Sequence, residues 1–281
     1  MAQGAQLDNQ DFRMMCRQWR RYRKLSQMEL ALAANVSQRH VSWLETGRSK
    51  PSREMVVRLS EALDIPLRER NVLLRSAGFA AAYRESRLDD PAMEPVLDAL
   101  EHVLRHHEPF PAVVVDRSWN VRMKNRAMDL LFSLGGDPAE LLRDVGDDGS
   151  MNLALMSLHP KGLRRYIANF DRIAPMFVGR LKREAIASGD PAMQEQYTRL
   201  IELAGVAAAD EAPTPEVMPV LPMQLDFGGL RLSVFSVIST FGTPQDITAD
   251  EIRIEGFYPA DDATATFFRQ RAASPAEGVS V

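Results

Sequence analysis

The sequence predicts two domains of different class. Residues 10–83 are expected to form an all-α domain of five helices. Residues 94–268 are expected to form an α+β domain, an antiparallel sheet with helices on one face. Three observations support this division into domains. The length of 281 residues suits two ordinary domains. The first region shows only the periodicity of helices, whereas the second contains strand patterns arranged as hairpins. Residues 84–93 are expected to be a polar linker, and residues 269–281 a disordered tail.

The helices of the first domain follow from their apolar spacing and their capping residues. Ser26 and Glu29 form an S-x-x-E capping box, and Ser37 is a favoured N-cap for the next helix. The expected segments are Phe12–Lys24, Ser26–Ala34, Ser37–Thr46, Ser52–Leu63 and a fifth helix that begins near Pro66 and ends at Gly78.

The second domain begins with a helix over Glu94–His107, after which the periodicity changes. A β-branched run and a segment of alternating apolar residues predict a first hairpin, and the Gly228-Gly229 pair predicts the turn of a second. The expected strands are Ala112–Val115, Trp119–Met123, Met223–Phe227, Leu230–Thr240 and Ile252–Tyr258. Helices are expected over Ala127–Leu134, Leu153–Leu158, Gly162–Ser188 and Ala192–Leu203, and a loop over Ala207–Pro219.

Charge is divided unequally between the two regions, although the net charge of the chain is only −4. Residues 1–88 carry 16 basic and 9 acidic residues, a net charge of +7, and the remainder carries 18 and 29, a net charge of −11. Such asymmetry is a hint of a polyanion-binding module joined to a second domain. A single cysteine, Cys16, excludes an internal disulfide. No apolar run suits a membrane span or a signal peptide, so a cytoplasmic location is expected.

Residues 25–52 read LSQMELALAANVSQRHVSWLETGRSKPS. This segment is expected to form two short helices with almost no gap between them, joined by a turn at Asn35. The second helix is expected to expose Gln38, Arg39, Ser42 and Trp43 from an N-terminus capped by Ser37. Gln suits adenine and Arg suits guanine in a major groove.

Phosphate contacts are expected beside this helix. Gln27 lies at the N-terminus of the first helix of the pair, and Arg48 and Lys50 lie in the loop that follows the second. The alternative interpretation of Trp43 is a partly buried packing residue. For the segment as a whole, the alternative is a helical bundle that only dimerises.

This pattern resembles the Cro/C1-type (XRE) helix-turn-helix domain over about Phe12–Gly78. The resemblance implies an ion pair between Arg20 and Glu45, which would close the base of the recognition helix. It also implies a homodimer on double-stranded operator DNA, with recognition helices in successive major grooves.

Three further segments, His106–Val121, His159–Ala174 and Leu230–Thr264, resemble the MmyB-like ligand-binding domain. That family is PAS-like, and the resemblance implies a small apolar effector, either a fatty acid or a related acyl compound. The alternative is that this domain is only a dimerisation or protein-docking platform with a solid core. Mass spectrometry of the native protein would separate the two.

Candidate residues for the effector site are flexible or aromatic apolar side chains, which suit an adaptable cavity wall, and polar side chains that would meet a carboxylate. The wall candidates are Met123, Phe132, Met156, Phe170, Phe177, Met223, Phe235 and Phe241, and the polar candidates are His159, Asn169 and Arg172. The alternative for each apolar candidate is plain core, which is the more frequent role of such a residue.

Neither catalysis nor metal binding is expected. His102 and His106 are four residues apart on a helix, but the H-E-x-x-H arrangement is absent. His159 is a weak candidate for a haem ligand. Cys16 has no second cysteine to resolve an oxidised thiol, so redox sensing is not expected. No cofactor other than the acyl effector is predicted.

Overall fold

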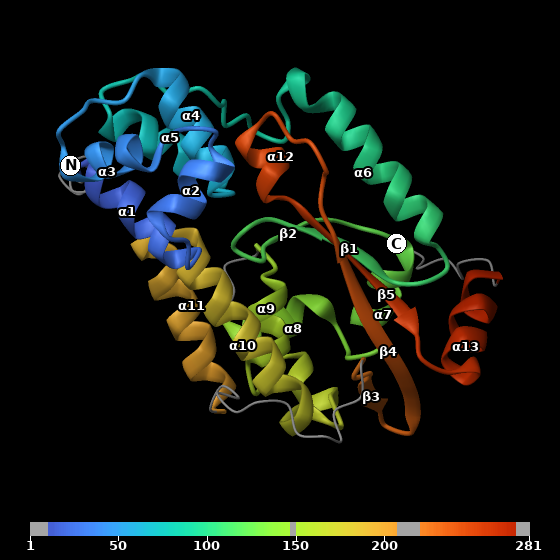
Figure 1. Ribbon diagram of the computed structural model, residues 1–281. Coiled ribbons are helices and arrows are strands. Elements are labelled where there is room, and N and C mark those ends of the chain that lie inside the picture. Colours follow the sequence, from blue (N-terminus) through green and yellow to red (C-terminus); the bar gives the residue numbers. More distant parts are fainter. Residues whose placement is uncertain (1–10, 147–149, 207–219, 274–281) are drawn as a thin grey trace. The chain divides into compact units, whose positions relative to one another are not determined.

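The computed structural model describes residues 11–146, 150–206 and 220–273, which divide into two compact units (Figure 1). The first unit extends to Ser86 and also includes Thr243–Asp250, and the second contains Arg87–Gly242 and the chain from Glu251 onward. The boundary at residues 86 and 87 falls inside the expected linker. The inclusion of residues 243–250 in the first unit was not expected from the sequence.

All five helices predicted for the first unit are present. Side chains of Asp11, Ser26, Ser37 and Ser52 accept hydrogen bonds from backbone N–H groups in the first turns of α1 to α4, and Ser26 and Glu29 complete the capping box. The helices are α1 (Phe12–Tyr22), α2 (Gln27–Ala33), α3 (Gln38–Thr46), α4 (Arg53–Ala62) and α5 (Leu67–Ser76).

The core of this unit collects one apolar face from each helix. Leu30, Val41 and Leu44 are completely buried, so α2 and α3 meet through their apolar residues. Asn35 adopts a positive φ of 51° between these helices, which is the left-handed conformation expected at the turn. Gly47 ends α3 with a φ of 76°, a backbone conformation that glycine adopts most readily.

The second unit contains the predicted antiparallel sheet of five strands. Its order is β2-β1-β5-β4-β3, and every neighbouring pair is antiparallel. The strands are β1 (Ala112–Val115), β2 (Val121–Lys124), β3 (Met223–Phe227), β4 (Leu230–Ser239) and β5 (Arg253–Pro259). The last strand therefore lies between the two hairpins and joins them into one sheet.

Most helices of the second unit pack on one face of this sheet (Figure 1). Val113 and Val115 of β1 lie in the main core on that face, whereas Ala112 and Val114 pack against α6 on the opposite face. The strand is consequently buried on both sides. The helices are α6 (Glu94–His107), α7 (Arg126–Ser133), α8 (Pro138–Val145), α9 (Leu153–Leu158), α10 (Phe170–Ser188), α11 (Pro191–Ala204) and α13 (Asp262–Ala273), with 3-10 turns at Pro91–Met93 and Leu163–Tyr166. Helix α12 (Ile247–Glu251) lies, except for its last residue, in the segment that belongs to the first unit.

Several expectations for the second unit were wrong in detail. The helix expected over Gly162–Ser188 is interrupted because Ile167 forms a bridge to Leu225 of β3. The second strand begins at Val121 because Trp119 has a φ of 68°. Helices α8, α12 and α13 were not anticipated. The loop expected over Ala207–Pro219 lies outside the described residues.

The expected disordered tail is wrong for residues 269–273. Helix α13 extends to Ala273, and Phe268 on this helix is almost completely buried. Its ring meets Phe110 edge-on, with 6.3 Å between centroids. This aromatic contact holds α13 against the core, so the helix extends through the polar residues that follow Phe268. Residues 274–281 lie outside the described part of the chain.

Residues 243–250 connect β4 to β5 but pack within the first unit. The Asp246 carboxylate accepts a hydrogen bond from the Ser86 N–H (3.1 Å), and the Thr248 hydroxyl donates to the Ser86 carbonyl (2.6 Å). Helix α5 has no side-chain cap at its own N-terminal residue. The Asp250 carboxylate instead accepts from the Leu67 N–H at 3.1 Å and supplies that cap.

Candidate functional site

The N-terminal half of α3 presents polar side chains to solvent. Ser37, Gln38 and Arg39 are exposed, while Ser42 and Trp43 are half-buried. The guanidinium of Arg39 lies 4.4 Å from the centroid of the Trp43 ring, a cation–π arrangement. This contact supports Arg39 from one side and leaves its N–H groups available for the edge of a base.

The opposite end of α3 is anchored by the ion pair expected from the resemblance. Arg20 donates to both carboxylate oxygens of Glu45, at 2.6 and 2.9 Å, and to the Leu25 carbonyl at 2.8 Å. Burial opposes ionisation of Glu45, but its hydrogen bonds with Arg20 and Gln27 prevail and lower its pKa. The pair therefore fixes the orientation of α3 against α1.

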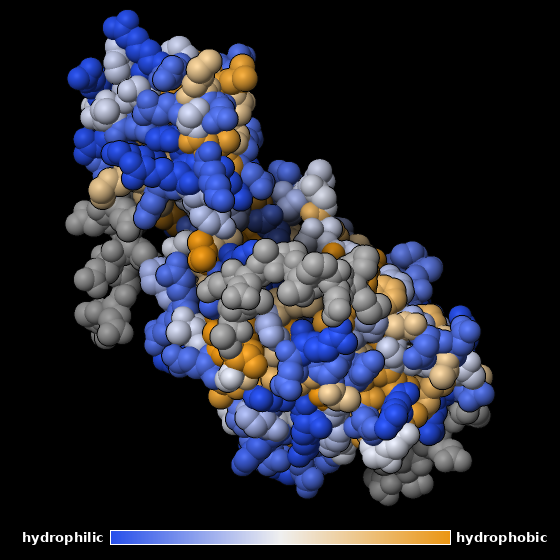
Figure 2. Space-filling view, turned by 60° about the horizontal axis from the view of Figure 1, so that its bottom comes forward, coloured by the Kyte–Doolittle hydropathy of each residue, from blue (hydrophilic) through white to orange (hydrophobic). Residues whose placement is uncertain are grey.

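Gln27 occupies a different position from the one expected of a simple phosphate contact. Its side-chain amide donates to Glu45 at 2.8 Å, so it belongs to the anchoring cluster. Arg48 and Lys50 are exposed in the loop after α3. Blue, hydrophilic side chains predominate on the visible surface of the first unit in Figure 2. The structure thus places Arg48 and Lys50, together with Arg39, where an anionic partner has access to them.

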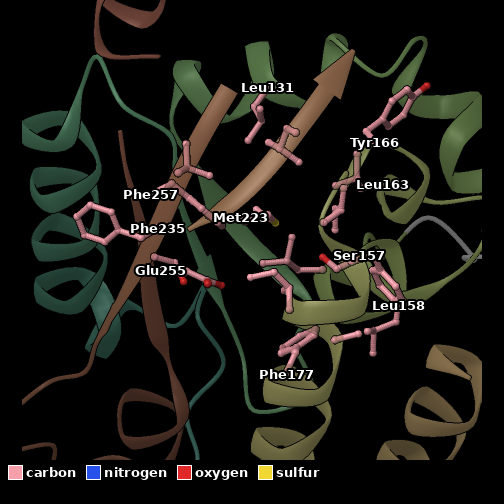
Figure 3. A pocket seen from close by; sticks show the side chains of 18 of the residues that line it. Leu131, Ser157, Leu158, Leu163, Tyr166, Phe177, Met223, Phe235, Glu255 and Phe257 are labelled. Atoms are coloured by element: carbon pink, nitrogen blue, oxygen red, sulfur yellow. The ribbon is translucent and has the colours of Figure 1, made fainter. Parts of the chain in front are cut away.

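The second unit contains a cavity of about 330 Å³ on the helix-covered face of the sheet (Figure 3). Helices α7, α9 and α10, the 3-10 turn at Leu163–Tyr166 and strands β3, β4 and β5 all contribute to its wall. Apolar side chains make up most of the lining, among them Leu131, Leu153, Leu158, Leu163, Ile173, Phe177, Leu225, Val234 and Phe257. A concave apolar site with few polar groups is the usual form of a small-molecule site.

An ion-pair cluster lies at one part of the cavity wall. The carboxylate of Glu184 accepts hydrogen bonds from Arg180 (2.7 Å) and from the Trp119 indole (3.1 Å), and it pairs with Arg253 at 2.8 Å. Burial opposes ionisation of Glu184, but Arg253 and Arg180 prevail and lower its pKa. Arg180 and Trp119 line the cavity, so this cluster fixes two of its walls.

Glu255 is the carboxyl group that lines the cavity itself. It lies on β5 between Val113 of β1 and Ile238 of β4, and it is buried. Figure 3 shows its carboxyl directed toward the interior of the cavity. Burial raises the pKa of Glu255, and a hydrogen bond with Ser236 opposes that shift only in part.

Four of the eleven residues predicted for the effector site line this cavity: Phe170, Phe177, Met223 and Phe235. The ring of Phe235 stacks on Tyr258 with 5.5 Å between centroids, and in Figure 3 it is directed away from the cavity. The side chain of Phe235 therefore does not point into the cavity, which leaves Phe170, Phe177 and Met223 as the predicted residues of its wall.

The seven other predicted residues lie elsewhere in the unit. Met123 and Phe241 pack in the smaller core beneath α6, Met156 packs with Leu141, and Phe132 is part of the main core. The polar candidates are used locally: His159 accepts from the Lys161 N–H, Asn169 bonds the backbone at Pro222 and Gln224, and Arg172 is exposed. The charged residues in the lining are instead Arg180 and Glu255.

Sequence reasoning missed Glu255, although a signal for it was present. Residues alternate sides along a strand, so Glu255 shares a face with Phe257 in the predicted strand. A glutamate on the buried face of a strand is unusual enough to be a site candidate.

The histidines considered for metal binding are exposed on α6. The rings of His102 and His106 lie 3.9 Å apart, and the His106 ring contacts the His102 carbonyl at 2.8 Å. Within the described residues, no group of three or more potential ligands is gathered for a metal ion. Cys16 is fully buried, and burial raises its pKa to about 12. No helix in the described ranges has the length and apolar character needed to cross a membrane.

The fold and the two sites together define a helix-turn-helix DNA-binding regulator with a ligand-binding domain. A helix-turn-helix domain model matches residues 16–73, and the model of the MmyB-like transcription regulator ligand binding domain matches residues 96–270. The second match covers more than half of the chain, which therefore belongs to the MmyB-like transcription regulator family.

Two further comparisons were made. Among solved structures, the chain is similar to the PAS domain from Bordetella pertussis BvgS, with 16% identity over 62% of this chain and 95% of that chain and a TM-score of 0.24. The comparison with curated proteins found no match.

Proposed function

We propose that this protein is a Cro/C1-type regulator that binds a near-palindromic operator as a homodimer, with one α3 helix in each of two successive major grooves. The observation that carries the proposal is the exposed N-terminus of α3, where Arg39 is supported by Trp43 and the helix is anchored through Glu45. The basic excess of the first 88 residues supplies the attraction to DNA.

The DNA proposal is tested by selecting binding sites from random duplexes and measuring affinity for the winning sequence. Arg39→Ala should relax the preference at one base position and cost about 1–3 kcal/mol. Lys50→Ala should weaken binding to all sequences alike and reduce the salt slope by about one. Arg172→Ala, an exposed change in the second unit, is the matched control. Unchanged specificity for Arg39→Ala would contradict this role of α3.

For the second unit, we propose that the cavity binds a small apolar effector of the acyl class. Its volume is roughly twice that of an engineered 150 Å³ cavity that takes up benzene, so it suits a chain of about ten carbon atoms. The alternative of a docking platform without ligand predicts an empty or collapsed cavity. Native mass spectrometry of the purified protein tests the choice. A bound species lost in Ala174→Leu, which fills the cavity, would support the ligand.

We further propose that the effector changes operator affinity by shifting the population of two conformations of the protein. Strand β5 contributes Glu255 and Phe257 to the cavity wall and follows directly on residues 243–250, which cap α5 and bond Ser86 in the first unit. A ligand that displaces β5 would therefore also displace residues 243–250 and change their contacts with α5, because the two segments are joined covalently. Asp250→Ala should reduce the effect of ligand on operator affinity while ligand binding is retained.

A further inference from the structure

The turn between β1 and β2, residues 116–120, contributes one side chain to the cavity wall. Trp119 lines the cavity, is almost completely buried, and meets the Phe177 ring edge-on with 5.3 Å between centroids. Its indole N–H donates to the Glu184 carboxylate on α10 at 3.1 Å. A ligand that fills the cavity therefore lies against this turn.

Arg117, two residues earlier in the same turn, holds a different segment of the chain. Its guanidinium donates to the Glu251 carboxylate at 3.1 Å and forms a second ion pair with Asp190. The side chains of Arg117 and Glu251 are only 18% and 17% exposed, so solvent screens this ion pair less than a surface pair. The Arg117 carbonyl also accepts from the Tyr197 hydroxyl at 2.5 Å, which fixes the backbone at this point.

The backbone between these two residues is tightly constrained. The Asp116 carboxylate accepts hydrogen bonds from the N–H groups of Ser118 (2.8 Å) and Asn120 (2.9 Å), and the Trp119 N–H donates to the Asp116 carbonyl at 3.0 Å. Trp119 itself has a φ of 68°, a conformation that few residues other than glycine adopt. A displacement of Trp119 therefore also displaces Arg117.

The partner of Arg117 lies at the boundary between the two units, which falls between Asp250 and Glu251. Within the first unit, the Asp250 carboxylate accepts from the Leu67 N–H at the start of α5. Within the second unit, Glu251 is held by Arg117. Two adjacent residues are thus fixed in different units, and one peptide bond joins them. A change in the position of Glu251 must therefore alter the position of Asp250.

Resting on the proposed effector switch, we propose that Arg117 is a positioning residue that transmits occupancy of the cavity to residues 243–250 through its ion pair with Glu251. The ligand displaces Trp119, the constrained turn moves with it, and Arg117 shifts Glu251 and the adjoining cap of α5. Strand β5 begins two residues after Glu251, so the turn and the strand act on the same point of the chain. Coupling between distant sites requires such a continuous set of contacts that both sites can bias.

The test measures, in the full-length protein, how far a ligand in the cavity changes the operator Kd. The probes are decanoate and 1-decanol, and calorimetry identifies the tighter of the two and its saturating concentration. In wild-type protein, occupancy should change the operator Kd by at least about fivefold. In Glu251→Gln, which keeps the shape and removes the charge, this change should fall below about twofold, because the ion pair with Arg117 is lost. Probe affinity should be retained, which also shows that the variant is folded.

Asp190→Asn is the matched control, because it removes the other ion pair of Arg117 and asparagine can still cap α11. It should keep the full effect of the ligand. Arg117→Gln should lose the effect as Glu251→Gln does, and the double variant should lose no more than either single variant. A role of this cluster in stability alone would affect Asp190→Asn and Glu251→Gln alike.

A full effect of the ligand in Glu251→Gln, or an equal loss of the effect in Asp190→Asn, would overturn the role of Arg117 and leave the effector switch in place. A different result would overturn the switch itself. If neither probe binds the wild-type protein, or if binding leaves its operator Kd unchanged, the proposed effector switch is wrong, and this inference with it.

Discussion

Removal of the Glu45 carboxylate should destabilise the first unit more than any surface charge change. The Glu45 side chain is only 3% exposed and that of Arg20 12% exposed, so Glu45→Ala leaves a buried guanidinium without its partner. It also removes the acceptor for the Gln27 amide. Loss of one member of a buried pair costs about 3–5 kcal/mol. For a unit of this size, the unfolding midpoint should fall by more than about 12 °C.

The assay is differential scanning calorimetry, in which the transition that shifts in Glu45→Ala is assigned to the first unit. Glu195→Ala removes an exposed pair with Arg199 in the second unit and is the control, with an expected cost below about 1 kcal/mol. The double variant Arg20→Met, Glu45→Leu should recover most of the stability because no charge then remains buried. The reasoning is refuted if Glu45→Ala and Glu195→Ala cost the same.

The effect of pH on this pair has a defined sign. The pKa of Glu45 is lower in the folded protein than in the unfolded chain, so its contribution is fully present above the unfolded pKa of about 4.3. The contribution is lost as the pH falls through the lower, folded value. The difference in stability between wild type and Glu45→Ala should therefore diminish in acid and remain constant near neutrality.

Three further predictions concern single residues. Cys16, whose pKa is raised to about 12, should resist iodoacetamide at pH 8 until the protein is unfolded in urea, and rapid alkylation of native protein would contradict its burial. Gly47→Ala and Gly78→Ala should each lower the urea midpoint of the first unit, because both glycines have a positive φ that alanine adopts only under strain; an unchanged midpoint in either variant would contradict this reasoning. Phe268→Ala should cost about 3–5 kcal/mol in the second unit, a loss that an unfolded tail would not show.

The first unit could be predicted from sequence almost in full because its signals are local. Ser26, Ser37 and Ser52 each begin a helix by capping backbone groups within three residues, and Asn35 marks the turn by its own conformational tolerance. The Arg20–Glu45 pair is more distant, 25 residues apart, and it was found only through the family resemblance.

The second unit was predictable in its strands but not in its cavity. Alternation and the Gly228-Gly229 turn are readable along the chain, whereas the cavity wall combines residues from seven separate elements. Periodicity cannot distinguish a methionine that lines a cavity from one that fills a core: Met223 does the first and Met156 the second. The polar candidates were chosen because they lie on or near one predicted helical segment, but His159 and Asn169 bond to the backbone of nearby loops instead.

The sequence also did not predict that residues 243–250, which connect two strands of the second unit, belong to the first unit. The contacts responsible are again distant along the chain. Asp250 caps α5 across 183 residues of chain, and nothing in the local sequence of Pro66 and Leu67 indicates a cap that comes from so far away. Such a contact is a property of the folded chain as a whole, and it is the structural basis of the coupling that we propose.

The most direct test of the account measures operator affinity with and without ligand in the cavity. Fluorescence anisotropy with the selected operator is recorded in the absence of ligand and at a saturating concentration of the tightest-binding probe, with occupancy confirmed by calorimetry. A coupling of 1–3 kcal/mol would change the operator Kd by at least about fivefold, and Asp250→Ala should reduce that change. An operator Kd that is the same for the occupied and the empty wild-type protein would contradict the account.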